Sequence, residues 1–257
     1  MKNLDIAQIA DSGQIFRFNR VGENKWELIA RDKYWLIDTT KEIRFPDRFW
    51  EHYFDIETDY SKFIDSIPET DEYLIKAAKA AEGIRILNQD PWEMLISFII
   101  SQRKSIPAIK TSIEKLCKAF GSKIEGIDAT EDKYAFPTPQ QLAKASLKEL
   151  EECSLGYRTE YVYEAAKRVA GGEYDLDKWK ELDDEALRKE LMAIKGVGIK
   201  VANCVMLFGY HRIGAFPVDV WIQRIMDNYY DGRFPVERYE GYAGVMQQYM
   251  FFYERSY

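Results

Sequence analysis

The chain has 257 residues, of which 46% are hydrophobic, enough for one or two domains with a sizeable core, and no apolar run of about 18 residues predicts a transmembrane helix. Its three cysteines, Cys117, Cys153 and Cys204, lie far apart and it has only two histidines, so we expect no cysteine- or histidine-ligated metal site, iron–sulfur cluster or Ser–His centre. The net charge of −7 argues against a nucleic-acid partner, because phosphate-binding proteins usually carry a basic surface.

The first third of the chain is predicted to form an antiparallel sheet. Three short segments, 15–21, 25–32 and 34–40, are rich in β-branched and aromatic residues and are separated by turn-prone stretches. Helical segments follow near 47–54 and over 71–82. The acidic N-terminus lacks the apolar stretch of a secretory signal, so we expect a cytoplasmic protein.

From Pro91 onward the pattern is helical. Asp90 is a good N-cap before a proline at the first helical position, and apolar residues then recur at helical spacing. Further helices are predicted from Ile106 to before Gly121, around 142–150, and over 161–170 and 183–194. The predicted fold class is therefore α+β, with an N-terminal β-rich domain with flanking helices over 1–86 and a mostly α-helical body over 87–257.

The segment from Leu191 to Met226 contains the most informative motif. Gly196-Val197-Gly198 separates two amphipathic helices, which predicts a helix-hairpin-helix over about 184–209. Two glycines allow positive φ and a close approach to another backbone, and exposed amides there can hold a phosphate. On its own, the motif is equally consistent with a simple tight turn.

Local charge in the helical region differs from the total. From Ser101 to Lys118 five basic residues stand against one acidic residue, and over 191–226 four stand against one. The local sign of charge matters more than the total for a docking surface. Such runs are also typical of ordinary solvated helix faces, so both interpretations stay open here.

Two residues of the informative segment are candidates for catalysis. Lys200 begins the second helix in apolar company, where partial desolvation and the helix dipole favour the neutral, nucleophilic amine. Asp219 follows nineteen residues later. It can cap the helix that begins at Val220 and still direct one carboxylate oxygen into a cleft.

These residues carry a family resemblance. Gly-Val-Gly-x-Lys-Val-Ala-x-Cys at 196–204, followed by Pro-Val-Asp-Val at 217–220, resembles the signature of bifunctional helix-hairpin-helix DNA glycosylases, above all the 8-oxoguanine DNA glycosylases. Four more segments resemble that family: Ser-Gly-Gln-x-Phe-Arg at 12–17, Gln-Asp-Pro and its helix at 89–99, Leu-Gly-Tyr-Arg at 155–158, and the final helix at 242–251. The resemblance extends over nearly the whole chain and is closest to the shorter prokaryotic members.

The resemblance implies an enzyme that excises 8-oxoguanine from duplex DNA and nicks the strand by β-elimination. Lys200 would attack C1′ of the sugar and form a Schiff base, and Asp219 would assist it. The nucleotide must be extruded, because its glycosidic bond cannot be reached inside a duplex. We expect a monomer in the cytoplasm, associated with the nucleoid, that acts on double-stranded DNA with oxidised guanine and needs no cofactor or metal.

The resemblance also implies a base pocket to which the N-terminal domain contributes, and a C-terminal helix that packs back on the N-terminal domain. Gly13 matches the glycine whose carbonyl accepts the N7 proton that 8-oxoguanine has and guanine lacks. Gln247 matches the residue that recognises the Watson–Crick edge. Cys204 and Phe251 match the residues that sandwich the base. Judged without the resemblance, both would be interpreted as core side chains.

The residues implied in DNA binding are Gly196, Val197, Gly198, Arg103, Tyr157, Arg158 and Trp221. Some positions depart from the family pattern. Arg103 stands where the animal enzymes have a gap-filling asparagine, Ala108 where they have a cytosine-recognising arginine, and Trp221 where they have a histidine. Strict pairing with an opposite cytosine is therefore not expected.

Two alternative functions stay open. A glycosylase for another damaged base would share the scaffold. However, alkyl-base enzymes lack the lysine, and adenine and endonuclease-type members usually carry a C-terminal iron–sulfur cluster, whereas this sequence has no cysteine after Cys204. A non-catalytic helix-hairpin-helix DNA-binding module would need the hairpin and a basic face. It would not need Lys200 or Asp219.

Overall fold

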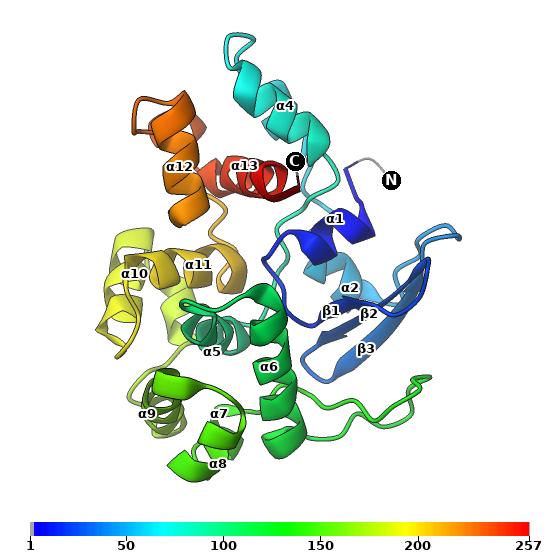
Figure 1. Ribbon diagram of the computed structural model, residues 1–257, viewed down its shortest axis with the longest axis vertical. Helices are drawn as coiled ribbons and strands as arrows, with labels where there is room; N and C mark the ends of the chain where they lie inside the picture. The colour runs from blue at the N-terminus through cyan, green and yellow to red at the C-terminus, as the bar shows by residue number, and fades with distance from the viewer. Residues whose placement is uncertain (1–2, 257) are drawn as a thin grey trace.

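A three-stranded antiparallel sheet lies on one side of a larger helical body in the computed structural model, which describes residues 3–256 (Figure 1). The strands β1 (Phe18–Arg20), β2 (Lys25–Ala30) and β3 (Lys33–Asp38) follow in sequence order. Leu28, at the centre of the sheet, lies opposite Phe18 on one side and Trp35 on the other. The predicted α+β class, with an N-terminal sheet and a helical body, is confirmed.

The first strand is shorter than predicted, because its beginning turns toward the helical body. Arg17 is 1% exposed and donates a hydrogen bond to Glu114 at 2.9 Å and another to the carbonyl of Tyr134 at 2.6 Å. Phe16 packs into the helical core rather than under the sheet. Residues 15–17 therefore connect the two layers and do not extend the strand.

A small separate core lies under the sheet. Helix α1 (Ile6–Asp11) and helix α2 (Arg48–Tyr53) contribute to it together with Phe18, Trp26 and Leu28. Helix α1 was not predicted from the sequence, although Asp5 caps it by accepting from the amide of Gln8. The helices α3 (Ser61–Asp65) and α4 (Glu72–Ala80) follow, and α4 buries its apolar face in the main core. The boundary at residue 86 stays a prediction.

The helical body is built around α5, ten of whose eleven residues are buried. Asp90 caps this helix and Pro91 begins it, as the sequence predicts. Helix α11 packs across α5, and the rings of Phe98 and Phe208 stack there with centroids 5.5 Å apart. The α-helices of the body are α5 (Pro91–Ser101), α6 (Ile106–Phe120), α7 (Pro139–Leu142), α8 (Leu147–Glu152), α9 (Thr159–Ala170), α10 (Asp184–Ala193), α11 (Ile199–Gly209), α12 (Val220–Tyr229) and α13 (Ala243–Ser256). Short 3-10 helices are η1 (Gly156–Arg158), η2 (Lys178–Glu181) and η3 (Val236–Tyr239).

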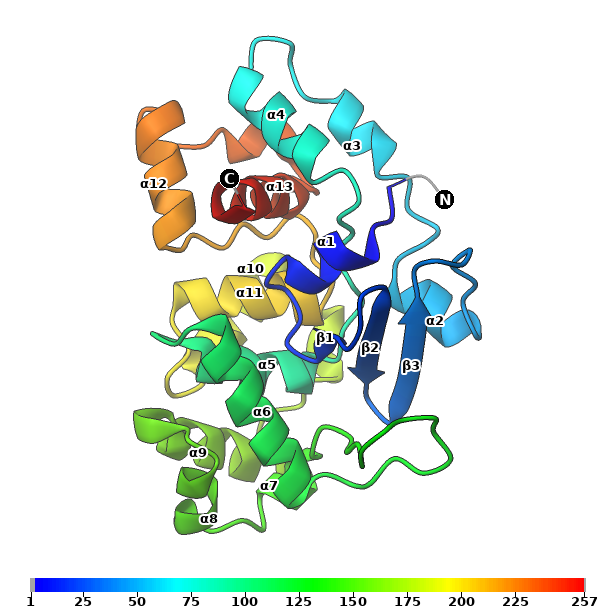
Figure 2. The same ribbon diagram turned by 45° about the vertical axis from the view of Figure 1, so that its right-hand side comes forward.

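The last helix, α13, packs against α4 and α12 at one end of the molecule (Figures 1 and 2). The hydroxyl of Tyr73 on α4 hydrogen-bonds to Glu254 at 3.2 Å, and its ring stacks on Tyr229 of α12 with centroids 4.0 Å apart. Two segments that are distant in sequence, α4 and α12, thereby hold α13 in place.

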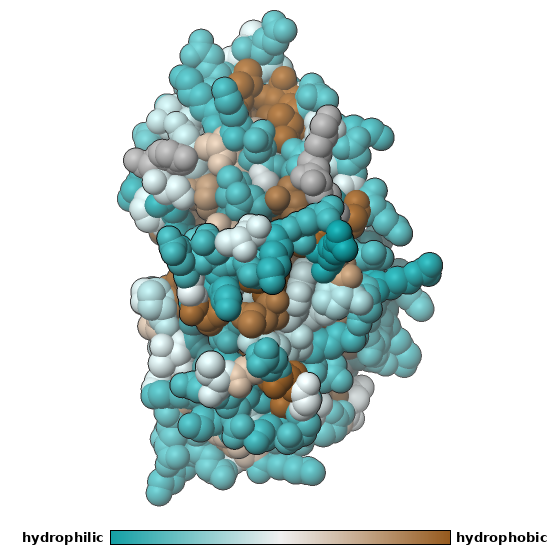
Figure 3. All heavy atoms as spheres, turned by 90° about the vertical axis from the view of Figure 1, so that its right-hand side faces the viewer, coloured by the Kyte–Doolittle hydropathy of each residue, from teal (hydrophilic) through white to brown (hydrophobic). Residues whose placement is uncertain are grey.

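The face of the molecule on the sheet side is largely hydrophilic, with scattered hydrophobic patches (Figure 3). Among residues 3–256, no helix is long and apolar enough to cross a membrane.

Candidate active site

The helix-hairpin-helix is formed by α10, α11 and the turn between them. Gly196 has φ +84°, and a Cβ at this position would overlap the ring of Tyr161. Gly198 has φ −91°, and open space surrounds the position of its missing Cβ. Of the two glycines, only Gly196 therefore uses the positive φ that glycine allows, and it makes the reversal of the chain.

The first turn of α11 leaves its amides available. Gly198 is the N-cap residue and supplies no capping side chain. Uncapped amides at a helix N-terminus, together with the positive end of the helix dipole, favour an anion such as a phosphate. Gln102 donates a hydrogen bond to the carbonyl of Gly196 at 3.0 Å and so connects the hairpin to the end of α5.

One cavity brings together all the residues predicted for catalysis and base binding. It lies where α11, α12, α13 and the N-terminal segment meet. Its volume is about 40 Å³, which holds a few water molecules and is far below the roughly 300 Å³ of a small ligand site. A purine base can enter only if the walls move apart. The predicted residues in its wall are Gly13, Lys200, Cys204, Asp219, Gln247 and Phe251.

A larger cavity of about 730 Å³ lies elsewhere, between the start of α5, the α7 region and the end of α9. Trp92, Phe136 and Tyr174 are among its lining residues, and none of the predicted catalytic residues reaches it. Size alone therefore does not identify the site, and the chemistry of the side chains favours the smaller cavity.

Lys200 is half-buried in the wall of the small cavity. Its ammonium lies 5.5 Å from the centroid of the Phe98 ring, within the range of a cation–π contact. Within residues 3–256 it forms no ion pair, so no carboxylate holds the amine away from the cavity. The amine is thus placed in an aromatic environment and directed to the space where a ligand would lie.

Asp219 is fixed by its role as the N-cap of α12. Its Oδ1 accepts hydrogen bonds from the amides of Trp221 and Ile222, both at 2.9 Å. Within the described part of the chain, Oδ2 accepts no hydrogen bond. One oxygen therefore positions the carboxylate, and the other remains available in a cavity that Lys200 shares.

Cys204 and Phe251 form apolar walls of the cavity. Burial raises the pKa of the Cys204 thiol, and the opposing charge of nearby Lys200 does not cancel this effect, so the thiol stays neutral. The Phe251 ring lies against Gly13, where a Cβ would be 2.8 Å from Cε1 of the ring. Gly13 also has φ +79°, so both the backbone and the space require glycine there.

The backbone around Gly13 is held by its neighbour Gln14, which is fully buried. The Gln14 Oε1 accepts from the amide of Leu87, and its Nε2 donates to Ser12 Oγ and to the carbonyl of Arg85, each at 2.9 Å. Every hydrogen-bonding group of this amide side chain is therefore occupied in fixing the turn at Gly13.

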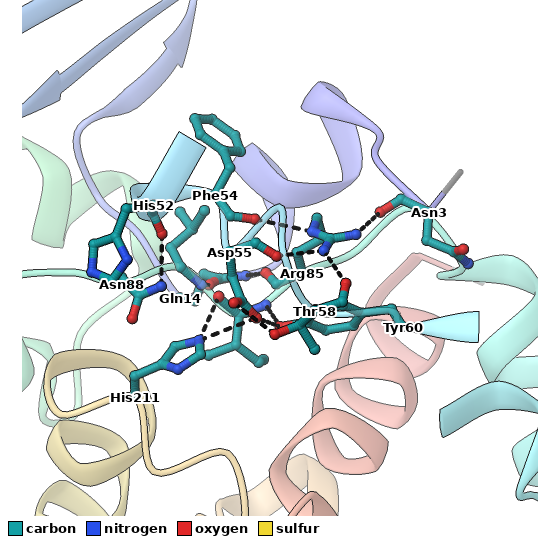
Figure 4. A network of polar contacts seen from close by, with 12 residues as sticks. Asn3, Gln14, His52, Phe54, Asp55, Thr58, Tyr60, Arg85, Asn88 and His211 are labelled. Atoms are coloured by element: carbon teal, nitrogen blue, oxygen red, sulfur yellow. Dashed lines mark hydrogen bonds and ion pairs between the residues drawn. The ribbon is translucent and has the colours of Figure 1, made fainter. Parts of the chain in front are cut away.

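Arg85 extends this support away from the cavity (Figure 4). Its guanidinium donates to backbone carbonyls of Asn3, Phe54, Asp55 and Thr58. His211, just after α11, contacts the carbonyl of Ile86 at 3.1 Å and Asp55 at 3.5 Å. Sequence reasoning did not single out Gln14 or Arg85 for a role, because their partners are distant in sequence.

The predicted DNA-contacting side chains differ in exposure. Arg103 is exposed with φ +49°, Tyr157 is 54% exposed, and Trp221 is half-buried. Arg158 is only 6% exposed: its guanidinium lies 4.3 Å from the Tyr157 ring and donates to the carbonyls of Leu155 and Gln102. In this structure Arg158 therefore holds the backbone at Leu155 and Gln102, and its charge is not exposed at the surface, as a direct contact with DNA would require.

Four further residues line the small cavity and were not predicted from the sequence: Phe98, Phe208, Pro217 and Gln248. Gln248 is 2% exposed and donates from Nε2 to Oε1 of Gln247 at 3.0 Å. A second glutamine beside Gln247, within the apolar first part of the final helix, was the signal that could have identified it.

Comparison with protein families gives two matches that together cover most of the chain. Residues 1–95 match the N-terminal domain of 8-oxoguanine DNA glycosylase, and residues 96–233 match the HhH-GPD superfamily of base excision DNA repair proteins.

Individual proteins give the same result. A solved structure of the Clostridium acetobutylicum 8-oxoguanine glycosylase/lyase, bound to double-stranded DNA with cytosine opposite 8-oxoguanine, is 34% identical, with a TM-score of 0.91 over 99% of this chain and 93% of that one. A probable N-glycosylase/DNA lyase of Methanothermobacter thermautotrophicus is 31% identical over 80% of this chain and 73% of its own length. The Saccharomyces cerevisiae N-glycosylase/DNA lyase is 39% identical over 58% of this chain, and that match spans 42% of the yeast protein.

Proposed function

The chain belongs to the 8-oxoguanine DNA glycosylases of the helix-hairpin-helix base excision repair superfamily, and on this basis we propose that it excises 8-oxoguanine from duplex DNA and nicks the strand at the resulting site. The observation that carries the proposal is the shared cavity of Lys200, Asp219 and the base-binding residues beside the hairpin. A hairpin that only bound DNA would not need an amine, a carboxylate and a set of base-recognising residues around one cavity.

The proposed chemistry uses the amine of Lys200 as the nucleophile. The amine attacks C1′ while the glycosidic bond breaks and the base leaves with the bonding electrons. Loss of a proton from the nitrogen and opening of the sugar ring give a Schiff base. Removal of a C2′ proton then expels the 3′ phosphate, which nicks the strand, and water finally releases the lysine.

Asp219 supports this reaction electrostatically. Positive charge develops on the sugar as the base leaves, and a carboxylate oxygen that faces the cavity stabilises that charge. The cap on α12 keeps the carboxylate in place without consuming the second oxygen. The carboxylate also favours transfer of the proton from Lys200.

Recognition of the lesion is proposed to rest on Gly13. Guanine presents only an acceptor at N7, whereas 8-oxoguanine presents an N–H donor, which the carbonyl of Gly13 can accept. Gln14 and the buried segment around Arg85 hold that turn rigid. Cys204 and Phe251 would lie on the two faces of the base, and Gln247 at its Watson–Crick edge.

DNA binding is assigned to the hairpin at 196–198 and to Arg103, Tyr157 and Trp221. In the proposed complex, the amides at the start of α11 bind a phosphate beside the lesion. Tyr157, whose ring is exposed, is proposed to contact the base stack. Arg158 would join the contact only after it leaves the carbonyls that hold it. We propose a monomeric enzyme that acts on chromosomal DNA in the cytoplasm.

A panel of duplexes with single lesions tests the proposal. Each duplex carries 8-oxoguanine, 3-methyladenine, 5-hydroxycytosine or an unmodified guanine at one position, and the released base and the nicked strand are quantified. We expect base release and nicking at 8-oxoguanine and neither at guanine. Release of a different lesion in its place, or binding without release, would contradict the proposal.

A further inference from the structure

The side chain of Gln248 lies in the wall of the small cavity with one half of its amide unused. Its Nε2 donates to Oε1 of Gln247 at 3.0 Å, whereas its Oε1 is buried and has no hydrogen-bond partner among residues 3–256. The residue is 2% exposed and lines the cavity together with Lys200 and Gln247. A buried acceptor without a partner is unfavourable, which points to a donor that arrives with a ligand.

The two neighbouring glutamines form a polar edge with a defined order of groups. Gln247 keeps its own Nε2 as a donor, because no hydrogen bond from it occurs within residues 3–256. The Oε1 of Gln247 has a second lone pair besides the one that Gln248 uses. The edge therefore offers one donor from Gln247, one acceptor from Gln247 and one acceptor from Gln248.

This set of groups is complementary to the Watson–Crick edge of a guanine-type base. That edge carries the acceptor O6, the donor N1–H and the donor 2-amino group, so it needs one donor and two acceptors. An adenine-type edge, with its acceptor N1 and donor 6-amino group, leaves an acceptor of the pair unmatched. A hypoxanthine-type edge lacks the 2-amino group and leaves one acceptor without a donor.

We propose that Gln248 is a specificity-determining residue, whose Oε1 accepts a hydrogen bond from the 2-amino group of the extruded guanine-type lesion. The inference rests on the proposed function and adds a contact to the same pocket. Gln248 also orients Gln247, because its Nε2 occupies one lone pair of the Gln247 oxygen and leaves the Gln247 Nε2 for O6.

The test compares two substrates and two proteins. The substrates are one duplex with either 8-oxoguanine or 8-oxohypoxanthine, which keeps N7–H and O8 and lacks only the 2-amino group. The proteins are the wild type and Gln248→Met, which conserves volume and removes both amide groups. Single-turnover excision rates give the ratio between substrates for each protein, and effects of the duplex on extrusion cancel between the two ratios.

We expect the wild type to excise 8-oxoguanine faster than 8-oxohypoxanthine. The ratio of these two rates should be about fivefold or more larger in the wild type than in Gln248→Met, because only the wild type has an acceptor that 8-oxohypoxanthine leaves unpaired. Tyr249→Phe is the matched control. Tyr249 is the next residue of α13 and also has a buried hydroxyl without a hydrogen-bond partner in the described part of the chain, but it does not line the cavity. This control should keep the wild-type ratio.

Equal slowing of both substrates in Gln248→Met would assign the residue a purely structural role and overturn the inference. If Gln248→Met does not fold, the wild type decides alone, since equal wild-type rates for the two substrates would also overturn it. A wild type that does not excise 8-oxoguanine at all would instead contradict the proposed function, so the two failures are distinguishable.

Discussion

Asp219 caps α12 through Oδ1, and in the proposed reaction its Oδ2 also stabilises charge in the cavity. Asp219→Asn keeps an oxygen for the cap and removes the negative charge. We expect base excision to slow by at least about tenfold, which corresponds to about 1.4 kcal/mol of barrier. DNA binding should change little, as measured by the affinity for a duplex that carries the lesion.

A matched control is Asp183→Asn, because Asp183 caps α10 in the same way, by accepting from the amide of Ala186, and does not line the cavity. That variant should excise at the wild-type rate. If Asp219→Asn also excises at the wild-type rate, Asp219 is a cap and nothing more.

A second prediction concerns the base opposite the lesion and follows from Ala108. It lies in the first turn of α6 and has no side-chain donor. Because one bidentate base contact gives about 1–3 kcal/mol of discrimination, its absence should leave excision opposite adenine, guanine or thymine within about tenfold of that opposite cytosine. Excision rates on four duplexes that differ only in the opposite base measure this.

Ala108→Arg should increase the preference for cytosine. Thr111→Arg, which adds the same charge at an exposed position further along α6, should not. A wild-type preference for cytosine above about a hundredfold would show that another donor has replaced the missing arginine, and would contradict this prediction.

The stability of the hairpin between α10 and α11 should depend more on Gly196 than on Gly198. Gly196→Ala forces a Cβ into a left-handed residue and against Tyr161, so we expect destabilisation of about 1–2 kcal/mol or more and weaker DNA binding. Gly198→Ala meets open space and ordinary φ, so the free energy of unfolding should stay close to that of the wild type. Urea unfolding and duplex affinity of both variants test the pair, and equal stability of the two would refute it.

The elements that sequence reasoning located well are those with strong local signals. Helix α5 combines the Asp90 cap, Pro91 and regular apolar spacing, and α10 and α11 frame the hairpin within the predicted 184–209. Helix α1 was missed because six residues with three buried side chains give too little periodicity. The first strand was predicted to begin too early. Arg17 and Phe16 are held by contacts with the helical body, and the local sequence pattern gives no sign of such contacts.

The candidate site could be predicted as a set of residues but not as an arrangement. Motifs pointed to Gly13, Lys200, Asp219 and Phe251, yet only the fold shows that one cavity holds them and that it is closed to a purine. The burial of Arg158 depends on the carbonyl of Gln102, from a loop more than fifty residues earlier. Such long-range contacts leave no local pattern in a single sequence.

At the scale of the whole molecule, a buried carboxyl group makes stability depend on pH. Glu93, near the start of α5, is 7% exposed, and burial raises its pKa to about 7 from 4.5, with Arg17 opposing the rise. The unfolded chain releases this proton above about pH 4.5, whereas the folded protein retains it up to about pH 7. The contribution of Glu93 to stability is therefore highest in acid and is lost as pH rises through this interval, by about 3 kcal/mol.

Glu93→Gln should remove this pH dependence, so that the variant gains stability relative to the wild type between about pH 5 and pH 8. Glu190→Gln, at an exposed position of α10, should keep the wild-type profile. Urea unfolding at a series of pH values measures the effect, and parallel profiles for the wild type and Glu93→Gln would show that Glu93 does not titrate in this range.

The proposed function requires Lys200 to act as a covalent nucleophile on an extruded 8-oxoguanine nucleotide. Borohydride reduction of a reaction mixture tests this directly, because it converts the Schiff base into a stable protein–DNA adduct. Lys195→Gln is the control, since Lys195 lies nearby but is engaged with Glu164 at 2.6 Å. We expect adducts on 8-oxoguanine duplexes with the wild type and with Lys195→Gln, and none with Lys200→Gln. Efficient trapping of Lys200→Gln would show that Lys200 is not the nucleophile.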